Sequence, residues 1–290
     1  MLHKDLAAVI KWASCNNMEL NESKFELIHH GYSDHLKHPY FLESGVKITS
    51  SDKVRDLGVM ISSDLSWNSQ YKNMIADAKK YAGWILRTFK SRNREVIMLL
   101  YNSFVRSRLE YCCPIWSPHY KKDIMAIEAI QRSMTAKING LRDLNYWERL
   151  EKLDLYSLQR RRERYQIMYV WKILHNYAPN DINMGFKQSL RHGPVATCPP
   201  LTSSRQHVNT IRDNSFSCTG PRLFNLLPKH IKLIDSMSKF KHSLDIFLKS
   251  FPDTPPTPGY IAVNNNSLVD WTLRRSADRH IGGATSLVLA

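Results

Sequence analysis

Hydrophobic residues recur at helical spacing through the middle of the chain, from Trp67 to about residue 178. In the first of these segments the apolar side chains are three, four or seven positions apart, which places them on one face of a helix: Ile75, Ala78, Ala82, Ile85, Leu86 and Phe89. Similar stripes predict helices over 97–105, 124–138, 147–153 and 157–176. The sequence therefore predicts a mainly α-helical fold.

A strongly basic composition accompanies these helices. The chain carries 41 Lys and Arg against 26 Asp and Glu, a formal net charge of +15. Such an excess favours a polyanionic partner, either nucleic acid or an anionic membrane surface. A solvated basic surface with no ligand is the alternative. Aromatic residues between the cations suit stacking on bases, although a single aromatic residue is more often part of the core.

The candidate nucleic-acid contacts are cations on or beside the predicted helices: Arg87, Lys90, Arg92, Arg106, Arg108, Arg132, Arg160, Arg161 and Arg162. We expect arginines on one face of these helices and apolar residues on the other. The last three crowd the first turns of the predicted helix over 157–176, where the positive end of the helix dipole disfavours cations. A bound anion would offset that cost, and a solvated charge run is the equally weighted alternative.

The first 66 residues read as a small α+β part. An amphipathic helix is predicted over 3–18, a turn over 21–23, and short strands over 25–28, 40–42, 46–49 and 57–61. These are too few strands for a sheet that is stable by itself. The pattern predicts that this part completes a larger structure.

The last third is predicted to be less regular. Residues 179–219 contain Gly193-Pro194 and Pro199-Pro200 without periodicity, which indicates a loop or linker. A small helical unit is predicted over 220–251. Residues 252–290 are rich first in Pro and then in Asn, and we expect a disordered tail.

Cysteine usage and hydropathy predict an intracellular protein, either cytoplasmic or nuclear. The five cysteines are scattered and suit reduced thiols rather than a disulfide framework. No apolar run reaches the roughly 18 to 20 residues that span a bilayer. The N-terminus lacks a signal-peptide core.

Residue patterns for catalysis and metal binding are weak. Four histidines, His29, His30, His35 and His38, cluster without a recognisable zinc spacing. The chain has no GxxxxGK[ST] phosphate loop and no Asp-Asp pair for a two-metal site. The residues alone predict no catalytic centre, no metal site and no cofactor.

Several sequence blocks occur in a characteristic order: Asp5-Leu6, Trp12, 18–24, 54–59, 65–128, Gln131-Arg132, Tyr146, Arg149-Leu150, Arg161-Arg162 and 220–228. Together they resemble the C-terminal half of the reverse transcriptase of jockey-type non-LTR retrotransposons, over about residues 2–251. The resemblance implies an incomplete palm remnant with a primer-grip-like hairpin over 1–66 and a helical, thumb-like bundle over 67–178. It also implies that the family's catalytic aspartates would precede Met1.

The resemblance further implies roles for a few residues. Lys24 is similar to the lysine after the catalytic turn, which is thought to assist pyrophosphate departure. Leu57, Gly58 and Val59 are similar to the grip that holds the primer strand. Mg²⁺ is expected only for an intact polymerase.

We therefore expect a truncated RNA-directed DNA polymerase that binds a template–primer duplex of RNA and DNA but is inactive alone. A separately encoded palm and fingers segment is a candidate partner, and no membrane partner is expected. The alternative is a repurposed, non-enzymatic basic module that binds nucleic acid or docks an acidic protein.

Overall fold

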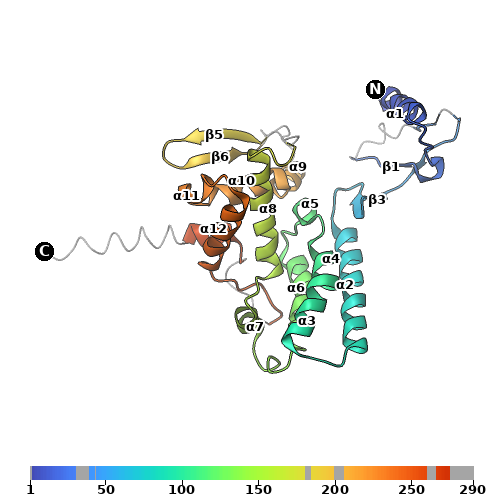
Figure 1. The fold of residues 1–290 in the computed structure, drawn as a ribbon. Helices are drawn as coiled ribbons and strands as arrows, with labels where there is room; N and C mark the ends of the chain where they lie inside the picture. Colours follow the sequence, from blue (N-terminus) through green and yellow to red (C-terminus); the bar gives the residue numbers. More distant parts are fainter. Residues whose placement is uncertain are drawn as a thin grey trace. The chain divides into compact units, whose positions relative to one another are not determined.

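The computed structural model describes residues 2–30, 39–42, 44–179, 184–198, 206–259 and 266–274. Backbone contacts divide the chain into two units, Met1–Lys72 and Asn73–Ala290. Helices make up most of the described structure, and the strands among the described residues form small two-stranded sheets (Figure 1). The expected mainly α fold with a small α+β N-terminal part is confirmed.

The first unit begins with helix α1 (Leu2–Cys15) and a short 3-10 turn η1 (Glu22–Lys24). The side chain of Asn21 caps that turn by accepting hydrogen bonds from the Ser23 backbone N, at 3.0 Å, and from Ser23 Oγ. This confirms the predicted helix and turn. Strand β1 (Glu26–Leu27) pairs in parallel with β2 (Thr49–Ser50). The strands expected over 40–42 and 46–49 are reduced to one bridge, between Phe41 and Lys47, and to the start of β2.

Strands β3 (Lys53–Asp56) and β4 (Val59–Ser62) form an antiparallel hairpin. Its two-residue turn consists of Leu57 and Gly58, whose φ angles are 44° and 87°. Positive φ at both positions is the type I′ arrangement, which matches the twist of paired strands. The predicted strand over 57–61 is therefore displaced, because its first two residues make the turn.

The second unit contains most of the helices. Helix α2 (Asn68–Thr88) begins in the last residues of the first unit and continues in the second. The bounds of the helices that follow are α3 (Arg94–Leu100), the π-helix η3 (Tyr101–Arg106), α4 (Ser107–Glu110), α5 (Cys113–Trp116), α6 (Lys121–Thr135), α7 (Tyr146–Leu153) and α8 (Leu158–Leu174). These confirm the predicted helices. Pro114 lies in the single-turn helix α5, where it fits because proline is tolerated in the first turn of a helix.

Helix α8 lies at the centre of this unit (Figure 1). It contacts α5 and α6 as well as α10 (Phe216–Asn225) and α12 (Met237–Lys249). Trp171 of α8 is fully buried and stacks on Phe240 of α12, with ring centroids 5.1 Å apart. The predicted unit over 220–251 is thus not separate, because its helices share one hydrophobic core with α8.

The predicted loop over 179–219 contains regular structure. Strands β5 (Gly185–Ser189) and β6 (Gly193–Thr197) pair antiparallel, and helix α9 (Gln206–Asp213) follows. The side chain of Asn225 in α10 binds both the backbone N and O of Ala196, at 3.0 and 2.7 Å. This contact from a later helix holds β6 in place. Because its partner lies outside the segment, the local composition of 179–219 predicted a loop instead.

The predicted disordered tail is also wrong for residues 252–259 and 266–274. The carboxylate of Asp253 accepts hydrogen bonds from the backbone N and Oγ of Ser157, at 2.6 and 2.7 Å, and from Nδ2 of Asn266, at 2.8 Å. Leu268 is fully buried in the core. The remainder of that predicted tail lies outside the described residues. A short helix α11 (Lys229–Lys232) completes the second unit.

Candidate nucleic-acid interface

Helix α2 presents a basic face to solvent. Its buried side includes Met74, Ala78 and Ile85. At 3.6 residues per turn, the exposed Lys79, Lys80 and Arg87 fall on the opposite side, within a sector of roughly 100°. This face carries cations that a phosphate backbone can approach.

Gly83 lies in the middle of the basic face. A Cβ atom at this position would come within 3.1 Å of Nη1 of Arg87, so the guanidinium group packs directly over the glycine. Lys90, just beyond the helix, is exposed as well. The predicted contacts Arg87 and Lys90 are therefore accessible. Lys79 and Lys80 were not among the predicted contacts, although their positions off the apolar stripe are the sequence signal that identifies them.

Arg92 and Arg108 are held by the fold rather than free. Arg92 donates to the carbonyl oxygen of Leu86, at 2.8 Å, and to that of Phe89. These hydrogen bonds satisfy carbonyl groups at the C-terminal end of α2. Arg108 lies over the Tyr81 ring, 3.6 Å from its centroid, and donates to the Phe104 carbonyl at 2.9 Å. Both side chains are half-buried, so they orient the helices beside the basic face.

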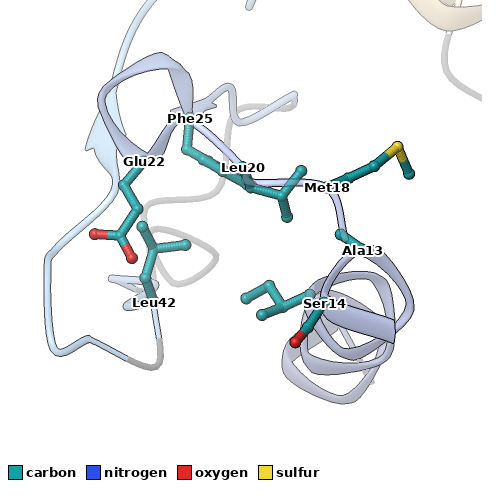
Figure 2. Close-up of a pocket in the computed structure, with 8 residues that line it drawn as sticks. Ala13, Ser14, Met18, Leu20, Glu22, Phe25 and Leu42 are labelled. Atoms are coloured by element: carbon teal, nitrogen blue, oxygen red, sulfur yellow. The ribbon is translucent and has the colours of Figure 1, made fainter. Parts of the chain in front are cut away.

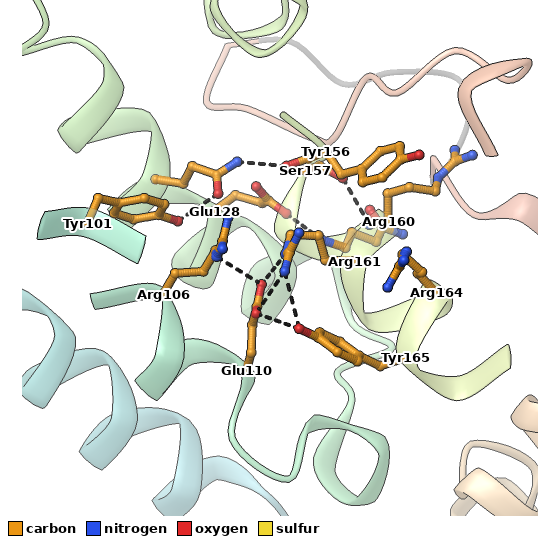
Figure 3. Close-up of polar contacts among 12 residues, drawn as sticks. Tyr101, Arg106, Glu110, Glu128, Tyr156, Ser157, Arg160, Arg161, Arg164 and Tyr165 are labelled. Atoms are coloured by element: carbon orange, nitrogen blue, oxygen red, sulfur yellow. Dashed lines mark hydrogen bonds and ion pairs between the residues drawn. The ribbon is translucent and has the colours of Figure 1, made fainter. Parts of the chain in front are cut away.

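The arginines of α8 are not on an exposed face, and this expectation is wrong. Arg160 and Arg162 are 0% and 1% exposed. Arg160 pairs with Glu163 at 3.4 Å, and Arg161 pairs with Glu110 of α4 (Figure 3). Arg160 and Arg161 are thus paired with carboxylates of the protein itself, and not with phosphates of a nucleic acid as expected.

Glu110 is the centre of the cluster in Figure 3. Its carboxylate accepts from Nε and Nη2 of Arg161 and from the hydroxyl of Tyr165 at 3.0 Å, and it lies 3.8 Å from Nε of Arg106. Arg106 is half-buried. The cluster joins η3 and α4 to α8, which is a structural role.

A second buried network surrounds Glu128 of α6. Its carboxylate accepts from the Tyr146 hydroxyl and from the Gln159 backbone N, both at 2.7 Å. Gln131 extends the network by donating to Tyr146 at 3.1 Å and accepting from Tyr101 at 2.6 Å. These groups hold η3, α6, α7 and α8 together, since satisfied buried networks rigidify a core.

The remaining predicted site residues are scattered. Arg132 is half-buried. In the first unit Leu57 is 84% exposed and Gly58 is exposed, whereas Val59 is only 5% exposed and is therefore not a surface contact. Lys24 is exposed on η1. The structure groups Arg87 and Lys90 with Arg92 at the end of α2, but it does not gather the α8 arginines onto that surface.

A cavity of about 230 Å³ lies in the first unit, next to the Lys24 turn (Figure 2). Its lining, largely apolar, comes from the end of α1 and the segment that follows, including Met18, Leu20 and Phe25. Glu22 supplies a carboxylate, which accepts a hydrogen bond from Ser44 Oγ at 2.9 Å. A cavity with this lining does not favour a phosphate group.

Within the described ranges, no group of three His, Cys, Asp or Glu side chains converges as a metal site would require. His29 and His30 are described, while His35 and His38 lie outside the described residues. No helix among the described residues is long and apolar enough to cross a membrane.

The stability of the protein should depend on the ionisation of Glu163. Burial raises the pKa of this carboxyl group to about 7, with Arg160 acting in the opposite direction and Asp253 reinforcing the rise. The folded state therefore binds this proton more tightly than the unfolded chain, whose carboxyl has the ordinary value of 4.5. The stabilising contribution of this carboxyl group is complete below that ordinary value and is lost as the pH rises through 7, by about 3 kcal/mol.

Urea unfolding of the wild type and of Glu163→Gln at pH 5, 6, 7 and 8 measures this contribution. The wild type should lose stability across the series, and the variant should lose about 2.5 kcal/mol less between pH 5 and pH 8. Parallel pH profiles for the two proteins would contradict the assignment to Glu163.

Comparison with known proteins adds one distant similarity. No family model and no solved structure matches the chain. An uncharacterised protein of Caenorhabditis elegans is 23% identical over 187 residues, which cover 63% of this chain and 85% of that protein. A similarity at this level, to a protein whose name states no activity, assigns neither a family nor a function to this chain.

Proposed function

We propose that this protein is a reverse-transcriptase-like fragment of non-LTR retrotransposon type that binds the backbone of a template–primer duplex without polymerising by itself. The observation that carries the proposal is the basic face of α2, where Lys79, Lys80 and Arg87 are exposed directly opposite the buried side of the helix. Cations on a rigid helix suit phosphate recognition, which is independent of base sequence.

An exposed tryptophan borders this face and supports the same function. Trp84 is 42% exposed, and its ring makes T-shaped contacts with Phe89 and Phe104 at centroid distances of 6.0 and 5.8 Å. These contacts hold the indole ring in a fixed orientation. A fixed aromatic ring beside cations suits stacking on an unpaired base at the end of a duplex.

The β3–β4 hairpin supports the family assignment. It occurs where the sequence blocks resemble the primer grip, and Leu57 projects at its tip with 84% of its surface exposed. Leucine is unfavourable here, both because φ is positive and because the side chain is in water. Such a residue at a turn is consistent with a contact to another molecule.

A second function for the same α2 face is docking of an acidic protein, such as a separately encoded palm and fingers segment. The exposed cations favour it as much as they favour phosphate. Salt dependence separates the two, because duplex binding releases condensed counterions and gives a slope of about −0.9 for each phosphate contacted.

The test is a triple charge reversal on α2, Lys79→Glu, Lys80→Glu and Arg87→Glu. The matched control reverses three exposed lysines elsewhere, Lys187, Lys239 and Lys241, so that both variants have the same net charge. Binding to an RNA–DNA hybrid is measured by fluorescence anisotropy between 50 and 200 mM salt. The α2 variant should bind at least tenfold more weakly and lose about 2 to 3 units of salt slope, because about three phosphate contacts are lost.

The control should retain most of the wild-type affinity. Equal loss in both variants would show that only net charge matters, and would contradict a defined α2 interface. Metal-dependent primer extension by this chain would overturn the proposal that it does not polymerise alone.

A further inference from the structure

The second unit contains a cavity of about 320 Å³ that the proposed nucleic-acid face does not use. It lies between the residues before α6, the first half of α8, the α9–α10 connection and the segment 267–270. Its lining includes six charged or amide side chains: Arg162, Glu163, Gln166, Asp213, Arg222 and Asp270. The volume is near the lower end of the roughly 300 to 1,000 Å³ range of small-molecule sites.

Arg162 differs from the arginines around it. Arg160, Arg161 and Arg164 each have a carboxylate partner within ion-pair distance, and the Arg164 pair with Asp245 is 2.6 Å long. Arg162 has none among the described residues, and its Nη1 and Nη2 atoms have no hydrogen-bond partner there. At 1% exposure, these two nitrogen atoms have lost their hydrogen bonds to water and have gained no acceptor from the protein in return.

Glu128 does not serve as an acceptor for Arg162. Its two carboxylate oxygens already accept hydrogen bonds, one from Gln159 N and one from the Tyr146 hydroxyl. It influences Arg162 only through the electrostatic field: burial raises the pKa of Glu128, and the charge of Arg162 lowers it. A buried guanidinium with unsatisfied donors is costly, and a bound water, ion or ligand is one way to satisfy it.

The other charged groups of the cavity leave Arg162 available. Glu163 pairs with Arg160, and Asp213 pairs with Arg222 at 3.3 Å. One helical turn after Arg162, Gln166 is 3% exposed, and its Oε1 atom also has no hydrogen-bond partner in the described structure. The cavity thus combines an unpaired cationic fork with an unpaired acceptor on the same side of α8.

We propose that this cavity binds a small organic oxyanion, a phosphate monoester or a carboxylate, that also carries a hydroxyl or N–H group. Nη1 and Nη2 of Arg162 donate to two oxygens of the anion, since planar guanidinium groups suit bidentate binding. Oε1 of Gln166 accepts the hydrogen of the neighbouring hydroxyl or N–H group. This goes beyond the proposed duplex binding, because a cation at 1% exposure cannot reach the backbone of a duplex.

Calorimetric titration of the full chain with three probes tests the proposal: inorganic phosphate, glycerol 3-phosphate and glycerate. Glycerol 3-phosphate should bind at least threefold more tightly than inorganic phosphate, because it adds a hydroxyl group for Gln166. Glycerate shows whether a carboxylate is accepted in place of the phosphate. Absence of binding by all three would overturn the proposal.

Variants assign the binding to the cavity. Arg162→Met should weaken glycerol 3-phosphate at least tenfold. Gln166→Met, of similar shape, should remove the preference for glycerol 3-phosphate while leaving inorganic phosphate within about twofold, because one hydrogen bond to the neutral group is lost. Unchanged affinities in both variants would place the ligand elsewhere and overturn the proposal.

A gain-of-binding variant decides the matter even if Arg162→Met does not fold. Asp270 is half-buried at the cavity and has no cation within ion-pair distance among the described residues. Asp270→Asn should tighten glycerol 3-phosphate two- to fivefold, because it removes a charge that repels the anion. Asp143→Asn, at an exposed aspartate outside the cavity lining, should leave the affinity unchanged. Equal affinities for the two variants would contradict the site.

Discussion

Replacement of Glu110 by alanine is expected to destabilise the second unit by about 3–5 kcal/mol. The change removes the carboxylate that pairs with Arg161 and accepts from Tyr165, and it leaves Arg106 without its ion pair. Arg161 and Arg106 are half-buried, so water replaces the lost contacts poorly. The large effect comes from leaving buried charge unpaired, more than from the intrinsic strength of the ion pair.

Urea unfolding at pH 7 measures the change. Lys249→Ala is the matched control. It breaks the ion pair between Lys249 and Asp154, which is 2.7 Å long and joins side chains that are 54% and 75% exposed. That loss should be under about 1 kcal/mol. Adding Arg161→Met to Glu110→Ala should restore part of the stability by removing the unpaired charge. A Glu110→Ala loss no larger than the control would show that the cluster contributes little.

The arginine run of α8 shows what local sequence cannot supply. Periodicity predicted the helix correctly, but the partners of Arg161 and Arg164 are 51 and 81 residues away in the chain. Whether a run of cations is solvated, faces a phosphate or is buried depends on those partners. Only the three-dimensional structure shows which partners lie close to it. One signal was present: Glu128 lies on the apolar stripe of α6, one turn after Ile124, which indicated a buried acid in need of donors.

The two hairpins also differ in whether local sequence or a distant contact determines them. The β3–β4 hairpin follows from a short local turn, so the sequence blocks identified it at nearly the right residues. The β5–β6 hairpin depends on Asn225, which binds Ala196 from 29 residues away. Glycine and proline near that hairpin were interpreted as loop signals, although Gly193, with φ of 72°, marks the turn where the chain reverses. On α2, by contrast, local sequence was enough to place Arg87 on the exposed side of the helix, although Lys79 and Lys80 of the same face were not selected.

Removal of residues 252–290 is expected to unfold the second unit or to destabilise it by more than about 4 kcal/mol. This segment supplies Asp253, which binds Ser157 at the start of α8, and the carbonyl oxygens of Pro252 and Asn266, which accept from Nη2 of Arg160 at 3.1 and 3.3 Å. It also supplies Leu268, which fills part of the core. Its loss would remove both carbonyl acceptors from the guanidinium of the fully buried Arg160, which would keep its ion pair with Glu163.

A chain that ends at Arg274 is the matched control, because it retains every contact of this segment named above. Thermal unfolding followed by circular dichroism compares the two truncations with the full chain. The chain ending at Phe251 should lose its cooperative transition or melt at least about 8 °C lower, since about 1 kcal/mol shifts the midpoint by roughly 2–4 °C in a domain of this size. The chain ending at Arg274 should melt within a few degrees of the full chain. If the shorter chain melted at the same temperature as the longer one, the segment would be a dispensable tail, as its composition alone had indicated.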